Sequence, residues 1–166
     1  CIVSSMESTM KVSSISQLFL AVIVCLAAAL VSADDAKNEA IKKDRKLIEG
    51  TWKAVAVEAD GGNVAEEHVK KLTVVNGPDG VWRLLSDGVE ISKGSSSFDP
   101  TKKPKTIDFS ITEGNGKGNQ YLGIYELGEN TRKVCFGPSS KARPTEFKAP
   151  AGSEYLFVIF EREKPK

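Results

Sequence analysis

Apolar and polar positions alternate with a period of two along most of the chain after residue 50, which is typical of strands that bury one face. The alternation is clearest over residues 106–112, where Ile107, Phe109 and Ile111 share one face. Turn signals rich in Gly, Asp, Asn and Pro interrupt it at short intervals. We therefore predict eight strands. Seven of them cover residues 51–58, 71–76, 81–85, 106–112, 120–127, 132–136 and 154–163. The eighth begins at Val89 and weakens through Gly94 and three serines.

Two segments depart from this pattern and have helical spacing. Residues 34–49 are charged and rich in helix formers, so we expect a helical leader whose last turn, at residues 45–49, covers one end of the strands. Residues 63–72 begin with a candidate N-cap, Asn63, and their spacing predicts a short helical lid between the first two strands. Residues 99–105 hold two prolines and three lysines, which indicates a stiff basic connection.

The order of the elements predicts an all-β fold, because no long helices alternate with the strands. Gly50 allows a tight turn before Trp52, whose indole we expect to plug one end of a barrel. In an up-and-down barrel the first and last strands are neighbours, which would lay Arg162 across the face of Trp52. We therefore predict an up-and-down antiparallel eight-stranded barrel over residues 50–166, with a short N-terminal helix and a helical lid.

The first thirty-three residues have the layout of a secretory signal. Lys11 precedes an apolar run over residues 18–30 that is too short to span a bilayer comfortably. Small residues at 31–33 suit signal peptidase, so we expect cleavage after Ala33 and an exported chain, periplasmic or secreted. An uncleaved membrane anchor is the alternative, and membrane association is expected only in that case.

The charge balance limits the expected partners, and the cysteine content limits the possible disulfides. The chain has 23 basic and 22 acidic residues, a net charge of +1. Loss of a leader that contains Lys11 and Glu7 leaves this balance unchanged. A balance so even provides no general attraction to nucleic acid or to an anionic membrane. Cys135 is the one cysteine after the leader, so we expect no internal disulfide in the mature chain.

Several motifs resemble those of known families. Gly50 and Trp52 after a short helix, with a late Arg162, resemble the signature of the lipocalins and the wider calycin barrels. Four segments resemble an exported domain family abundant in planctomycete bacteria, namely DPTKKPKTID at 99–108, GIYEL at 123–127, KVCF at 133–136 and RPTEF at 143–147. They stand in that family's order. The family is regarded as lipocalin-like and has no settled biochemical function, so the resemblance implies a barrel and export and supplies no catalytic residues.

No catalytic set stands out, and we predict neither an enzyme nor a cofactor or metal site. His68 is the only histidine, so a histidine-based metal cluster is not available within one chain. A base–nucleophile pair of His68 and Cys135 is conceivable, but a solvated histidine and a packed cysteine are much more common. The glycine-rich run at 114–118 lacks the ending of a phosphate loop and joins two strands, so we interpret it as a hairpin.

The barrel interior is the remaining candidate site. Eight strands enclose a space that is either filled by side chains or holds one small ligand, and barrels of this type do both, so both possibilities stay open. Both faces of the last strand are apolar, so the alternation does not show which of its residues face inward. The alternative function is a filled barrel that binds a protein partner through the loops at 99–105 and 143–147. The first hypothesis is a small hydrophobic or amphipathic ligand, contacted by Trp52, Ala54, Ala56, Phe109, Tyr121, Tyr125, Tyr155 and Phe157.

Overall fold

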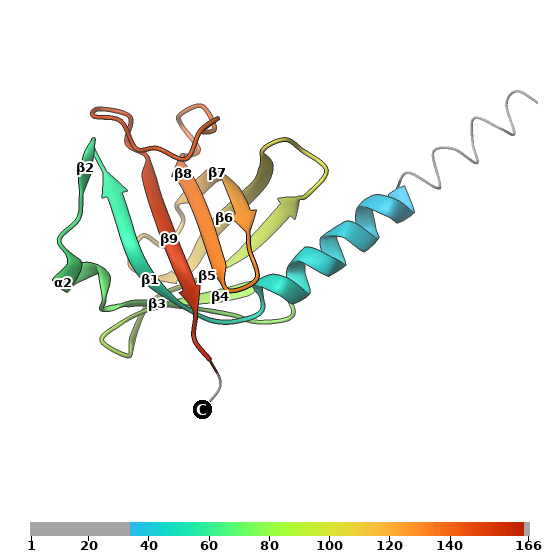
Figure 1. Ribbon diagram of the computed structural model, residues 1–166, viewed down its shortest axis with the longest axis horizontal. Coiled ribbons are helices and arrows are strands. Elements are labelled where there is room, and N and C mark those ends of the chain that lie inside the picture. The colour runs from blue at the N-terminus through green and yellow to red at the C-terminus, as the bar shows by residue number, and fades with distance from the viewer. Residues whose placement is uncertain (1–33, 165–166) are drawn as a thin grey trace, which may run out of the picture. The chain divides into compact units, whose positions relative to one another are not determined.

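The computed structural model describes residues 34–164 (Figure 1). The chain divides into two compact units, Cys1–Asn38 and Glu39–Lys166. Residues 34–48 are helical, and the part of this helix from Glu39 onward belongs to the second unit. The expected signal segment, residues 1–33, lies outside the described residues, and so does the expected cleavage site. No helix in the described part of the chain has the length and apolar character needed to cross a membrane.

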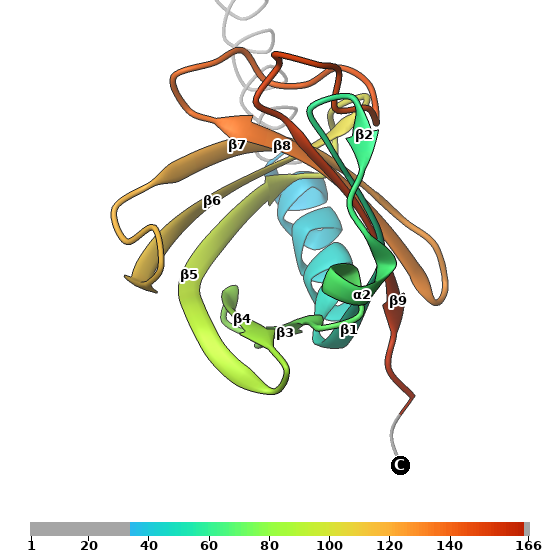
Figure 2. The same ribbon diagram turned by 90° about the vertical axis from the view of Figure 1, so that its left-hand side faces the viewer.

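The second unit is a closed barrel of eight antiparallel strands, which confirms the predicted fold class. From β3 to β9 each strand pairs with the next along the chain, and β1 closes the circle by pairing with both β3 and β9. Figure 2 looks into this ring of strands. A two-residue strand, β2, pairs with β1 and with no other strand of the described residues. The strands are β1 (Gly50–Ala59), β2 (Gly62–Asn63), β3 (Leu72–Asn76), β4 (Val81–Ser86), β5 (Val89–Asp99), β6 (Lys105–Gly114), β7 (Gln120–Leu127), β8 (Thr131–Pro138) and β9 (Leu156–Arg162).

The strand that was predicted to weaken at Gly94 continues as β5 to Asp99, although its register with β6 shifts between Lys93 and Gly94. Gly94 lies opposite Trp82 on β4. A Cβ atom at Gly94 would stand 2.4 Å from the Trp82 ring and 2.0 Å from the Ser110 carbonyl oxygen. Glycine here makes room for an indole rather than ending a strand.

The segment at 63–72 differs from the predicted helical lid. Asn63 belongs to β2, where it pairs with Glu58 of β1, and it does not cap a helix. The only helix in this segment is α2 (Glu66–Val69), whose N-cap residue, Ala65, makes no side-chain cap hydrogen bond. Val69 is buried and joins the apolar core. One short turn of helix, α2, therefore stands where a longer lid was expected (Figure 2).

A β-bulge in β1 changes which residues face the barrel interior. The register with β9 shifts between Ala54 and Ala56. Ala54 is buried, Ala56 is exposed, and Val57 faces inward again. An extra residue in one strand shifts the phase of the alternation beyond it. A strict two-residue period places Ala54 and Ala56 on the same face, and the bulge separates them.

Trp52 plugs one end of the barrel as predicted. Its side chain is 0% exposed, and its indole nitrogen donates a hydrogen bond to the carbonyl oxygen of Ile48 at 2.7 Å. The guanidinium carbon of Arg162 lies 4.2 Å from the centre of the indole. Arg162 also donates hydrogen bonds to the carbonyl oxygens of Glu49, at 2.8 Å, and Leu47. The arginine thus stacks on the plug and ties the end of the helix to the last strand.

The long loop after β8 covers part of the outer surface of the barrel. Cys135 is fully buried beneath it and its thiol donates to the carbonyl oxygen of Lys148 at 3.2 Å. Burial raises the pKa of the Cys135 thiol. Arg143 donates to the carbonyl oxygen of Gly123 at 2.7 Å and forms an ion pair with Asp108. The loop is therefore held to the barrel wall, with Cys135 packed away from solvent as a small apolar residue.

Candidate ligand-binding cavity

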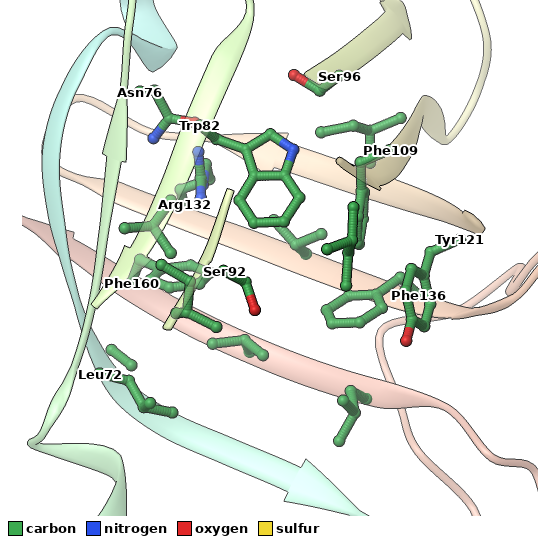
Figure 3. Close-up of a pocket in the computed structure, with 18 of the residues that line it drawn as sticks. Leu72, Asn76, Trp82, Ser92, Ser96, Phe109, Tyr121, Arg132, Phe136 and Phe160 are labelled. Carbon is green, nitrogen blue, oxygen red and sulfur yellow. The ribbon is translucent and has the colours of Figure 1, made fainter. Parts of the chain in front are cut away.

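The barrel encloses a cavity of about 380 Å³ between β1 and the inward faces of the other barrel strands (Figure 3). That volume lies within the range of sites that hold small organic molecules. The apolar lining residues are Ala54, Val57, Leu72, Val74, Trp82, Leu84, Ile91, Ile107, Phe109, Ile111, Tyr121, Val134, Phe136, Leu156, Val158 and Phe160, and the polar ones are Asn76, Ser92, Ser96, Asn115 and Arg132.

Aromatic rings form one wall of the cavity. Phe109 stacks on Tyr121, with ring centres 5.3 Å apart, and meets Phe136 edge-on at 4.8 Å. Trp82 approaches Phe109 edge-on at 6.0 Å. These contacts come from β4, β6, β7 and β8, because inward positions on neighbouring strands lie side by side. The wall therefore offers an apolar aromatic surface to the cavity.

A buried polar contact closes the barrel beyond the cavity. Asp44, on the helix before β1, is 4% exposed and accepts hydrogen bonds from the Tyr125 hydroxyl and the Lys105 ammonium group, both at 2.7 Å. Burial and the Asp44 carboxylate raise the pKa of Tyr125. Arg45 of the same helix lies 5.2 Å from the centre of the Phe98 ring. The helix therefore covers this end of the barrel.

The polar residues of the cavity are of two kinds. The Ser92 hydroxyl donates to the carbonyl oxygen of Asn115 at 2.8 Å, so it is satisfied within the protein. Three buried nitrogen atoms have no hydrogen-bond partner among the described residues: Nδ2 of Asn76, Nε1 of Trp82 and Nε of Arg132. Buried donors are nearly always paired in folded proteins, so three unpaired donors in one cavity require an explanation.

Arg132 is the most unusual of these groups. It is 6% exposed, and its side-chain Nε has no hydrogen-bond partner among the described residues. Its guanidinium carbon lies 4.7 Å from the Phe160 ring centre and 5.3 Å from that of Trp52. Burial, with a smaller effect from the nearby Arg162 charge, lowers the pKa of Arg132 to about 10. A buried cation with aromatic contacts and no counter-charge is costly to maintain.

The structure brings together only some of the residues predicted to contact a ligand. Ala54, Phe109 and Tyr121 line the cavity. Trp52 and Tyr125 belong to the plugged end and do not line it.

The other three predicted contact residues lie away from the cavity. Ala56 is exposed because of the bulge in β1. Tyr155 and Phe157 are on the outer side of the barrel, where Tyr155 packs over Gly137 and Phe157 meets Phe147. Aromatic character and small size alone therefore do not distinguish the inside of the barrel from its outside.

The polar cavity residues were missed by the sequence reasoning, although alternation points to two of them. Asn76 continues the inward row of Leu72 and Val74, and Arg132 shares a face with Val134. The predicted contact residues are all aromatic or small, so they do not include the charged group on an inward face.

Other candidate chemistry has little support from the geometry. Within residues 34–164 no group of three or more His, Cys, Asp or Glu side chains is placed to hold a metal ion. His68 is exposed on α2, whereas Cys135 is buried under the outer loop. In the basic connection, Lys105 is paired with Asp44, and Lys102 and Lys103 are exposed.

No protein-family model, curated protein or solved structure matches this chain.

Proposed function

We propose that this chain is an exported lipocalin-like protein that binds a small hydrophobic or amphipathic molecule inside its barrel. The observation that carries the proposal is the cavity of about 380 Å³ with a mostly apolar lining. The side chains that line an empty cavity of this size lack the dispersion contacts that they would make in a well-packed interior. An apolar ligand would restore those contacts, so binding would stabilise the barrel.

The remaining parts of the proposal rest on the sequence. The signal-like layout of residues 1–33 supports export, and the four motifs described above support membership of the planctomycete-type lipocalin-like family. The alternative, a filled barrel acting through its loops, loses support from the open interior and from Arg143, which bonds to the barrel wall.

Binding of a neutral apolar fluorophore tests the proposal. N-phenyl-1-naphthylamine fluoresces strongly only in apolar surroundings, so the purified protein should raise its emission with saturation at one molecule per chain. Ala54→Phe places a ring into the cavity and should weaken binding by about tenfold or more, because it occupies ligand volume. Ala56→Phe is the matched control, since the same ring at this exposed position should leave binding unchanged.

Native mass spectrometry of protein purified gently from its own host provides a second measurement. An added mass that leaves on denaturation would support the proposal and begin to identify the ligand. The proposal fails if the protein carries no added mass and also leaves the fluorophore's emission unchanged.

A further inference from the structure

We infer that the ligand is an amphipathic anion, with an acidic head group held by Arg132 and Asn76 near the plugged end and an apolar tail directed toward the other end. This inference rests on the proposed function and adds the chemical class and the orientation of the ligand. It begins from the three unpaired nitrogen donors of the cavity.

The donors share one end of the barrel. Asn76 is the last residue of β3 and pairs with Gly50, the first residue of β1, and it also pairs with Trp82 on β4. Arg132 is near the start of β8 and lies beside the Trp52 plug. Figure 3 draws Asn76, Trp82 and Arg132 in the same part of the view, and the indole nitrogen of Trp82 points away from Asn76 and Arg132.

The charge of this end favours an anion. Arg132 and Arg162 both lie against Trp52: their guanidinium carbons are 5.3 and 4.2 Å from the centre of the indole ring, respectively. Arg162 is satisfied by the backbone carbonyls of Glu49 and Leu47, whereas Nε of Arg132 has no such acceptor among the described residues. The open groups of Asn76 and Arg132 are both donors, so they match a head group that only accepts hydrogen bonds. An ionised carboxylate has that character and also neutralises the buried guanidinium.

The rest of the cavity excludes a small, fully polar anion. Beyond the donors the wall is made of aliphatic and aromatic side chains, and Leu72 and Leu156 continue this lining toward the end of the barrel that the helix does not cover. Filling this wall requires an apolar body attached to the head group. An unbranched chain of about twelve carbons is a suitable probe for a cavity in this size class.

The test compares three probes that share a twelve-carbon chain: dodecanoate, 1-dodecanol and dodecylamine. Each displaces N-phenyl-1-naphthylamine from the purified protein at pH 8, where the acid is ionised. We expect dodecanoate to bind about tenfold or more tightly than 1-dodecanol, because only the acid forms charge-assisted hydrogen bonds with Arg132. Dodecylamine should bind most weakly, because its charge repels the guanidinium.

Arg132→Met removes the charge and keeps a side chain of similar length. It should abolish the preference for dodecanoate over 1-dodecanol and leave 1-dodecanol binding within about threefold. Folding should be retained, because an unpaired buried charge is replaced by an apolar group. Arg83→Met is the matched control: Arg83 is exposed on β4 and faces Glu90 at 3.9 Å, so the preference should remain. Asn76→Leu should reduce the preference by a smaller factor, about threefold.

The outcomes separate the inference from the proposed function. Equal binding of dodecanoate and 1-dodecanol, a preference for dodecylamine, or an unchanged preference in Arg132→Met would each overturn the anionic head group, while binding in the barrel would stand. If neither the fluorophore nor any of the three probes binds, the proposed function fails and the inference fails with it. A preference for dodecanoate that disappears in Arg132→Met and persists in Arg83→Met would establish it.

Discussion

Two tryptophans with opposite roles show how much depends on single residues. Trp52 is fully buried, hydrogen-bonded to the backbone of the helix and stacked under Arg162. Trp82 faces the cavity, and its indole nitrogen has no partner among the described residues. The first indole therefore contributes to stability, and the second lines the proposed binding site.

Trp52→Ala should lower the free energy of unfolding by roughly 3–5 kcal/mol, because it leaves a large void at the plugged end. Denaturant unfolding followed by far-ultraviolet circular dichroism measures the loss. Val55→Ala is the control: Val55 is next to the bulge and exposed, so its truncation should cost about 0.5 kcal/mol or less. A loss below about 1 kcal/mol for Trp52→Ala would show that the indole is not the plug described here.

The helix before β1 acts as a structural element of the barrel from Glu39 onward. Ile48 packs into the core beside Trp52, and Asp44 reaches across to β6 and β7. A helix that supplies both an apolar contact and a buried acceptor can close this end of the barrel.

Asp44→Ala should lower the free energy of unfolding by roughly 2–3 kcal/mol, because it leaves the Tyr125 hydroxyl without its acceptor in a buried site. The measurement is again equilibrium denaturation. Glu39→Ala is the control on the same helix, since the exposed pair with Lys42 should contribute less than about 0.5 kcal/mol. Equal losses in the two variants would mean that the helix does not hold the barrel through Asp44.

The whole molecule is proposed to reach its site of action by export, which makes a prediction about its mass. Expressed from its full sequence in a host that secretes proteins, the chain should be recovered outside the cytoplasm beginning at Asp34. Ala33→Phe removes the small residue next to the expected cleavage site, so a longer product should accumulate. Recovery of the uncleaved, unaltered chain in the cytoplasm would contradict export and leave the barrel and its cavity unaffected.

The strand order and the end plug could be predicted from the sequence, because they depend on local patterns. The turns between strands and the alternation at 106–112 mark the barrel, and the spacing of Gly50, Trp52 and the late Arg162 marks its plug. The site could be predicted only in part. Ala54, Phe109 and Tyr121 line the cavity, whereas Tyr155 and Phe157 lie outside it. Both faces of β9 are apolar, so its inward face depends on its pairing with β1 and β8.

The sequence by itself determined the periodicity of the strands, the turns between them and the even charge balance, since each depends on residues close together in the chain. Tertiary structure decided the rest. The bulge at Ala54 and Ala56 separated one inward residue from one outward residue, and the pairing of Asn76 with Gly50 placed a polar group at the plugged end. Burial then left Arg132 without a counter-charge among the described residues. Those features depend on contacts between distant strands, which no local pattern contains.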